Sequence, residues 1–288
     1  MPTVRTGDFE CWYADDWFGP AWEQPEVVLI QAGFGRNGEY WRHWVPGLSG
    51  DFRVIRRDMR AHGGSTAGDP GHVWSPEGLA EEVIWLLDAL GIQRVHFVGE
   101  SVGGITGIVL GATHPDRLHT VTLVQTPLHL RGVGDLMRGE HPSWASALRE
   151  LGAGGWVARN MRPDDPQTAW ERAQWDRCDL DALCRLADAT PGVDVTSYVG
   201  AIGVPALVLA PACSPLTPLA DQLLLRTSIP VAELELFEGR GHTVYQDEPE
   251  RCIARLRRFI VERHLRPGRA NGQPGRSSSQ TITAGRPT

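Results

Sequence analysis

The sequence predicts an α/β protein built on a doubly wound, mostly parallel sheet. Short apolar runs rich in β-branched residues alternate with segments whose apolar residues recur at helical spacing. This order indicates parallel strands with helices on both faces of the sheet. With 288 residues and 41% hydrophobic content, the chain is long enough to bury one large core.

Six runs are predicted to be strands, and Gly, Asp or Pro lies near their ends: 27–30, 52–55, 95–98, 121–124, 205–209 and 234–237. Between the second and third runs, the apolar residues from Leu79 to Leu90 have the spacing of an amphipathic helix. The same spacing recurs from Ile253 to Ile260, behind Pro249 at a predicted helix start.

The alternation stops between residues 127 and 195. This segment contains Trp144, Trp156, Trp170 and Trp175 and is too long for a loop, so we expect a helical insertion. Each Trp could simply pack the insertion onto the core, but together they indicate an aromatic pocket wall. The predicted organisation is a core at 1–126 and 196–265, a helical lid at 127–195, and a tail at 266–288.

Charge is distributed unevenly along the chain. The net charge is -7, yet the tail has four Arg and no acid, so residues 1–265 carry -11. That acidic body argues against nucleic acid as a partner, because phosphate binding needs a concentrated basic face. The Gly, Pro, Ser and Arg of the tail predict disorder, with a functional basic arm as the alternative.

Several other classes are excluded or disfavoured by composition. All 28 basic residues are Arg, which excludes lysine Schiff bases and Gly-Lys-Ser/Thr phosphate loops. The five Cys are scattered and the acidic and His residues show no ligand spacing, so we expect no disulfide framework, no metal and no cofactor. No signal peptide and no apolar run of about 18 residues is seen, which predicts a cytoplasmic protein with no membrane partner. The expected partner is a small-molecule substrate, which the predicted site described below would bind. Oligomeric state has no signature in the sequence.

Ser101 is the predicted nucleophile. The strand at 95–98 runs into Gly99-Glu100-Ser101-Val102-Gly103, and a helical pattern follows at once. In this strand-turn-helix setting, G-x-S-x-G lifts the Ser hydroxyl to the carboxyl end of the strand on a sharp, strained turn. A plain strand-helix turn is the alternative interpretation.

His242 is the predicted base, since a Ser hydroxyl is a weak nucleophile without one. It follows the last predicted strand and precedes the helix that begins near Pro249. Loops at the carboxyl ends of parallel strands converge on one crevice, so His242 and Ser101 can meet there. His62 is the second choice and is expected to be structural.

These residues resemble the α/β-hydrolase superfamily, in particular its small lid-bearing esterases and lactonases similar to 3-oxoadipate enol-lactonase. The resemblance spans about residues 5–265 and rests on the Ser101 elbow, Gly241-His242, and the segments 31–35 and 58–65. It implies an oxyanion hole formed by the backbone N–H groups of Phe34 and Val102.

The acid of the family's triad is missing. Its usual place, four residues before Pro218, holds Ser214, and the alternative place after the strand at 121–124 holds Gln125 and Thr126. Ser214 could orient His242 by accepting a hydrogen bond, but it brings no charge. A carboxylate could instead reach His242 from elsewhere in the chain, from one of four residues: Asp221, Asp194, Glu238 or Glu100.

Three functions remain open from the sequence. The leading hypothesis is a serine hydrolase that cleaves a small, fairly apolar ester or lactone whose good leaving group tolerates a weakened triad. The second is a non-hydrolytic enzyme of the same fold, such as a lyase, isomerase or cofactor-free oxygenase, with His242 as base. The third is a catalytically silent protein that binds a small molecule.

Overall fold

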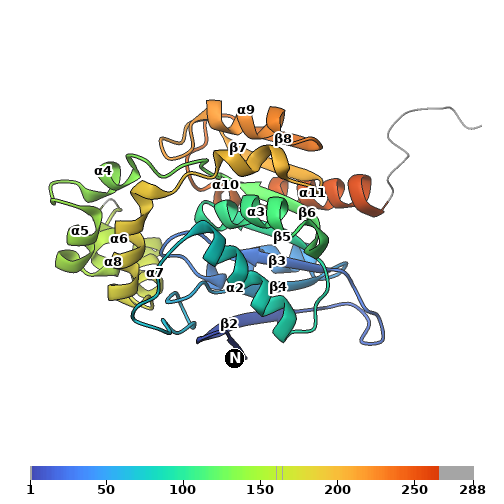
Figure 1. Ribbon diagram of the computed structural model, residues 1–288, viewed down its shortest axis with the longest axis horizontal. Coiled ribbons are helices and arrows are strands. Elements are labelled where there is room, and N and C mark those ends of the chain that lie inside the picture. Colours follow the sequence, from blue (N-terminus) through green and yellow to red (C-terminus); the bar gives the residue numbers. More distant parts are fainter. Residues whose placement is uncertain (1, 160, 164, 266–288) are drawn as a thin grey trace, which may run out of the picture.

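The computed structural model describes residues 2–159, 161–163 and 165–265, so the predicted tail at 266–288 lies outside the described residues. Eight strands form one sheet in the order β1-β2-β4-β3-β5-β6-β7-β8 (Figure 1). The strands are β1 (Thr3–Thr6), β2 (Phe9–Asp16), β3 (Val27–Gln31), β4 (Arg53–Arg57), β5 (Val95–Glu100), β6 (Leu118–Val124), β7 (Ala206–Pro211) and β8 (Ala232–Phe237).

Helices connect most of these strands. The α-helices are α1 (Val45–Leu48), α2 (Pro76–Ala89), α3 (Val102–Thr113), α4 (Val133–Arg138), α5 (Trp144–Leu151), α6 (Ala153–Ala158), α7 (Pro166–Trp175), α8 (Leu180–Ala189), α9 (Leu219–Ser228), α10 (Val244–Asp247) and α11 (Pro249–Ile260). Short 3-10 segments are η1 (Gly38–Trp44), η2 (Pro115–Arg117), η3 (Thr190–Gly192) and η4 (Thr196–Ala201), and η5 (Val261–Leu265) is a π-helical extension of α11.

The predicted fold class is confirmed. Strands β4, β3, β5, β6, β7 and β8 pair in parallel, and all six correspond to predicted runs. The two N-terminal strands, β1 and β2, were not predicted, and they add an antiparallel edge to the sheet. Their sequences mix polar and apolar residues, and β2 ends in two Asp residues, so the apolar pattern there is weak.

Both faces of the sheet are buried, as a doubly wound fold requires. Alternate residues of β3 point to opposite faces: Val27 and Leu29 belong to the core cluster that includes residues of α2, α3 and α9, whereas Val28 and Ile30 belong to the cluster that includes residues of η1, α1 and α11. The continuous apolar run of β3 follows directly from this two-sided burial.

Helices α4 to α8 lie between β6 and β7 in the chain and gather at the left of Figure 1. They contain the four Trp residues that the sequence placed in one segment. Trp144, Trp156 and Trp175 are buried, whereas Trp170 is 39% exposed. The three buried indoles form a chain with ring centroids 5.6 and 5.0 Å apart, so they pack as one aromatic layer.

A cluster of buried charges anchors α2 to the sheet. Glu82 on α2 is 1% exposed, and its carboxylate lies 2.6 Å from Arg60 and 3.5 Å from Arg57. Arg60 also pairs with Asp8 at 2.5 Å. Glu82 is the only carboxylate paired with Arg57 among the described residues, whereas Arg60 has both Glu82 and Asp8, so two carboxylates balance two guanidinium groups.

Candidate active site

Ser101 lies on a strained turn between β5 and α3. Its backbone has φ 53° and ψ -112°, a region that costs a non-Gly residue of order 1–3 kcal/mol. The turn is tight enough that a Cβ on Gly99 would lie 2.1 Å from the carbonyl oxygen of Gly103. A Cβ on Gly103 would lie 2.3 Å from that of Gln31. The two Gly of the motif are therefore required sterically.

His242 lies in the loop between β8 and α10 and meets Ser101, as the order of the strands predicts. The distance between His242 Nε2 and Ser101 Oγ is 3.2 Å. Its other ring nitrogen, Nδ1, lies 3.1 Å from Ser214 Oγ. Three residues that are distant in sequence are thus aligned as hydroxyl, imidazole and hydroxyl.

Ser214 differs from the expected acceptor. Its Oγ accepts hydrogen bonds from the backbone N–H groups of Leu216 and Thr217, both at 3.2 Å. Because a hydroxyl has two acceptor lone pairs and one proton, the remaining capacity of Ser214 is to donate its proton to His242 Nδ1. This arrangement favours the tautomer with the proton on Nε2, whereas a base for Ser101 needs a free Nε2.

The imidazole of His242 is also a weak base. Burial lowers the pKa of His242 to about 3, and the positive charge of Arg36 acts in the same direction. The imidazole is therefore neutral over the whole physiological pH range. An Asp at position 214 would raise this pKa by stabilising the imidazolium, and Ser214 has no charge with which to do so.

Glu100 is the carboxylate nearest to the site, but it faces the wrong nitrogen. Its Oε1 lies 4.0 Å from His242 Nε2, the nitrogen that also faces Ser101. The carboxylate accepts hydrogen bonds from Gly33 N at 2.7 Å and from Arg36 and Gln125, both at 3.0 Å. The charge of Glu100 is thus balanced by Arg36, and its hydrogen bond from Gly33 N fixes the loop after β3.

The other three carboxylates considered as substitutes do not reach His242. Asp194 pairs with Arg131 at 3.1 Å on the surface. Asp221 and Glu238 form no ion pair or hydrogen bond with His242 in the described part of the chain. None of the four candidates occupies the position of a triad acid.

Gln125 has a role that sequence reasoning missed. It occupies the alternative acid seat, and its backbone has φ 41°. Its side-chain amide donates to the carbonyl oxygen of His242 at 2.7 Å and accepts from Val244 N at 3.1 Å. Gln125 therefore fixes the loop that carries His242. Its signal in the sequence was a polar residue at the end of a buried strand.

The predicted oxyanion donors, Phe34 and Val102, face the same cavity as Ser101. Neither backbone N–H has a hydrogen-bond partner in the described part of the chain. Val102 is the first residue of α3, where an amide has no intrahelical acceptor. The ring of Phe34 packs on Trp144 with centroids 4.1 Å apart.

His62, the second choice for a base, is fully occupied in holding a loop. Its Nε2 accepts from Gly35 N at 3.0 Å, and its Nδ1 donates to the carbonyl oxygen of Arg60 at 2.8 Å. Burial lowers the pKa of His62 to about 4, so it stays neutral.

A cavity of about 450 Å³ lies above Ser101 and His242. Helices α4 to α6 and the end of α7 supply apolar walls, and Arg36 and Glu100 are the charged residues that line it. Such a cavity suits a small, largely apolar molecule with a few polar groups. The residues are Phe34, Arg36, Glu100, Ser101, Val102, Pro127, Leu130, Val133, Met137, Trp144, Trp156, Val157, Trp175, Thr190, Leu216, His242 and Thr243.

Comparison with known proteins identifies the family. Residues 26–157 match the family described as alpha/beta hydrolase fold. A protein of Pseudomonas syringae named "Putative carbamate hydrolase RutD" is 30% identical over 245 residues, which cover 81% of this chain and 93% of that protein. The chain belongs to the α/β-hydrolase superfamily.

Within this superfamily the chain resembles 3-oxoadipate enol-lactonases. 3-Oxoadipate enol-lactonase 1 of Acinetobacter baylyi is 24% identical over 255 residues, 83% of this chain and 90% of that protein. The crystal structure of the enol-lactonase from Burkholderia xenovorans has a TM-score of 0.78 and 25% identity, and the match covers 91% of this chain and all of that one. These similar proteins are hydrolases. No helix in the described ranges is long and apolar enough to cross a membrane.

Proposed function

We propose that this α/β-hydrolase is a serine hydrolase that cleaves a small, fairly apolar ester or lactone, with Ser101 as nucleophile and His242 as base. The observation that carries the proposal is the 3.2 Å separation of Ser101 Oγ and His242 Nε2 beside an aromatic cavity. The strained backbone of Ser101 supports the same role, because strain of this kind is retained where it positions a reacting group.

In the proposed mechanism, His242 reacts from its less favoured tautomer, with the proton on Nδ1 facing Ser214, so that the free Nε2 can take the proton of Ser101 as Oγ attacks the carbonyl carbon of the substrate. The N–H groups of Phe34 and Val102 stabilise the oxyanion, an effect worth about 10²–10³-fold in rate for each donor. His242 then gives the proton to the leaving oxygen. Water, activated by the same imidazole, hydrolyses the acyl-enzyme.

The missing acid narrows the substrate class. Replacing the triad Asp by Asn lowers turnover about 10⁴-fold in the Ser-His-Asp template, which corresponds to about 5.5 kcal/mol. A substrate whose leaving group is already stable, such as an enolate, has a lower intrinsic barrier and tolerates this loss. The names of two similar proteins, both 3-oxoadipate enol-lactonases, support an enol lactone or another activated ester. A carbamate is the alternative class, from the names of other relatives.

We further assign residues 1–126 and 196–265 to the catalytic core and 127–195 to a lid. The Trp layer of α5 to α7 supports this division, because it lines the cavity opposite Ser101. In this role the lid shields the cavity from bulk water while Ser101 attacks, and it opens for release of the products.

The test uses p-nitrophenyl esters of short acyl chains and the Ser101→Ala and His242→Ala variants. Both variants are expected to lose hydrolysis, and Ser228→Ala on α9 serves as the matched control that keeps it. A fluorophosphonate probe should label the wild type and Ser228→Ala but not Ser101→Ala. Full activity in Ser101→Ala would refute the nucleophile assignment, and absence of both labelling and ester turnover in the wild type would refute the serine hydrolase.

A non-hydrolytic enzyme is the second candidate, favoured by one observation: Ser214 stabilises the tautomer in which Nε2 of His242 is protonated. In that tautomer Nε2 cannot take a proton from Ser101 but can donate one, so His242 would act on a substrate oxygen as a hydrogen-bond donor or general acid. Ser101→Ala would then keep activity while His242→Ala loses it, and an equal collapse in both variants would eliminate this candidate.

A further inference from the structure

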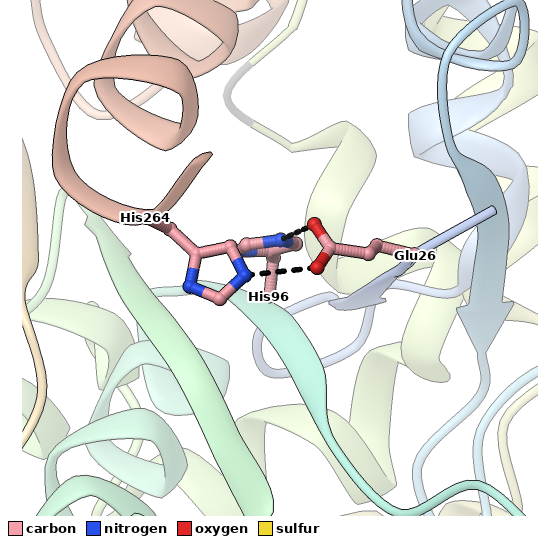
Figure 2. A group of neighbouring side chains, drawn as sticks. All are labelled: Glu26, His96 and His264. Atoms are coloured by element: carbon pink, nitrogen blue, oxygen red, sulfur yellow. Dashed lines mark hydrogen bonds and ion pairs between the residues drawn. The ribbon is translucent and has the colours of Figure 1, made fainter. Parts of the chain in front are cut away.

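A cluster of His and Glu residues lies near the amino-terminal ends of β3 and β5, whereas Ser101 follows the carboxyl-terminal end of β5. Glu26 directly precedes β3, His96 is the second residue of β5, and His264 lies in η5 (Figure 2). The Glu26 carboxylate lies 3.1 Å from His96 Nε2 and 2.8 Å from His264 Nε2. The sequence predicted no metal site because these residues are separated by up to 238 positions.

We propose that Glu26, His96 and His264 form a binding site for a divalent transition metal, with Zn²⁺ as the best fit. Two imidazole nitrogens and one carboxylate are the donor set that suits Zn²⁺ and its transition-metal neighbours, whereas Mg²⁺ and Ca²⁺ prefer oxygen ligands alone. This proposal does not depend on the proposed function of Ser101 and His242.

The distances allow an ion to enter with small movements. The three ligand atoms lie within 4.8 Å of one another. Bonds to Zn²⁺ of about 2.0–2.1 Å in tetrahedral geometry place ligand atoms about 3.3 Å apart. The two Glu-to-His distances end on different oxygens, 3.1 Å from Oε2 to His96 and 2.8 Å from Oε1 to His264, so the carboxylate would bind the ion through both oxygens, or through one oxygen after it turns. Figure 2 shows the carboxylate facing both imidazoles.

The ring of His96 is already oriented for this role. Its Nδ1 lies 3.0 Å from the hydroxyl of Thr120 on the neighbouring strand β6. With the hydroxyl as acceptor, the Nδ1 proton is held there and Nε2 is left free to bind an ion. A hydrogen bond on the far nitrogen is the usual device that fixes a metal-binding His.

A further imidazole lies beside the three ligands. His119, the second residue of β6, has its ring centroid 4.2 Å from that of His264 and 5.1 Å from that of His96. Its Nδ1 is buried and has no hydrogen-bond partner among the described residues. Buried polar atoms are normally satisfied, so this nitrogen indicates that the cluster lacks a partner. A rotation of the His119 ring would offer a fourth ligand, with water as the alternative.

The cluster also has an entry path. A surface hollow of about 630 Å³ borders Glu26 and is lined by Glu23, by Asp51 and by Arg257, which pairs with Asp51. Glu26 and His264 are 33% and 26% exposed, whereas His96 is fully buried. A hydrated cation can therefore first contact the exposed carboxylate and then exchange water for the two imidazoles.

A metal here would be structural. His96 and Ser101 lie near opposite ends of β5, and five residues of strand correspond to about 16 Å. The ion would join η5, the end of the last helix, to the first residues of β3 and β5. It would therefore stabilise the docking of α11 without touching the substrate cavity.

The experiment uses untagged full-length protein, freed of metal with a chelator and titrated with Zn²⁺ by calorimetry. We expect one Zn²⁺ per chain. At 100 times the dissociation constant the melting temperature should rise by about 5 °C. Co²⁺ in place of Zn²⁺ should give the visible absorption of a tetrahedral site, and Mg²⁺ should produce neither effect.

Two variants at partly exposed positions test the ligands. Glu26→Gln keeps the side-chain shape, and His264→Ala removes one imidazole; each should weaken Zn²⁺ binding by at least about 100-fold. His114→Ala is the matched control, because His114 is a partly exposed His that pairs with Glu81 at 3.4 Å, outside the cluster. Wild-type protein that binds no stoichiometric Zn²⁺, or variants that bind it as tightly as wild type, would identify the cluster as a hydrogen-bonded network only.

Discussion

Restoring a carboxylate at position 214 should increase the activity of this enzyme, and the substitution is Ser214→Asp. The new carboxylate would lie where Ser214 Oγ now lies, 3.1 Å from His242 Nδ1. It could still accept from the N–H groups of Leu216 and Thr217. Unlike the hydroxyl, it has no proton to donate, so it would force the Nδ1 proton onto His242 and free Nε2 for Ser101.

The size of the gain follows from the structure. The upper bound is the roughly 10⁴-fold, or about 5.5 kcal/mol, that separates Asp from Asn in the Ser-His-Asp template. Glu100 lies 4.0 Å from His242 and already supplies part of the field, but Arg36 at 3.0 Å from the same carboxylate cancels most of it. We therefore expect kcat/KM for an unactivated ester to rise by about 10²–10⁴-fold.

The assay compares wild type, Ser214→Asp and the matched control Ser214→Asn on a p-nitrophenyl ester and on an alkyl ester of the same acid. The gain should be larger for the alkyl ester, because its poorer leaving group relies more on the imidazolium. The acidic limb of the pH profile should also move toward neutral pH in Ser214→Asp, because the carboxylate raises the pKa of His242.

If Ser214→Asp folds normally but gains no more than Ser214→Asn on either ester, the tautomer and charge of His242 do not limit the reaction. The assignment of His242 as general base for Ser101 would then fail. A gain in both variants would instead indicate that relief of the Ser214 hydroxyl, and not charge, is responsible.

Three further predictions address pH, the core and the lid. Because His242 must be neutral to act as base and its pKa is about 3, wild-type kcat/KM for an activated ester should stay constant as the pH falls from 7 to about 4, and a decline centred near pH 6 would contradict this. Glu82→Gln should lower the free energy of unfolding by about 3–5 kcal/mol in urea titrations, because the buried Arg57 loses its carboxylate partner while Arg60 keeps only Asp8. The more exposed Glu81→Gln on the same helix should change it by less than about 0.5 kcal/mol, and equal losses would argue against the buried cluster. Gly35→Ala should lower kcat/KM by about 10²-fold, because Gly35 has φ 72° and a Cβ there would lie 2.3 Å from the indole of Trp175. Gly200→Ala is the control: a Cβ at Gly200 would meet no atom within 4 Å, so kcat/KM should stay unchanged.

Much of the fold could be predicted because burial on two sides leaves a clear record. Strands β3 and β7 contain continuous apolar runs, whereas β4 (RVIRR) and β8 (AELELF) carry shorter or alternating apolar patterns. The helical spacing from Leu79 to Leu90 corresponds to α2 (Pro76–Ala89). The antiparallel strands β1 and β2 at the sheet edge were not predicted, because their sequences mix polar and apolar residues and contain no apolar run typical of a buried strand. Pattern reasoning was thus strongest where both sides of a strand are covered.

The site could be predicted only in part. Ser101 and His242 follow from strand order, because parallel strands end at one edge. The roles of Gln125 and Arg36 depend on side-chain directions that no spacing encodes. Ser214 was identified by position, but whether it donates or accepts depends on the two loop amides beside it.

Phe34 links the proposed oxyanion hole to the Trp layer of α5 to α7. Its amide is a proposed donor to the oxyanion, and its ring centroid lies 4.1 Å from that of Trp144 and 6.0 Å from that of Trp175. If the Trp layer moves outward to admit a ligand, the Phe34 ring loses its packing contact with Trp144 and Trp175. We therefore expect two conformations. When the Trp layer opens to admit substrate, the Phe34 amide is less well positioned, and when the layer closes, its packing on the Phe34 ring holds that amide in the proposed oxyanion hole.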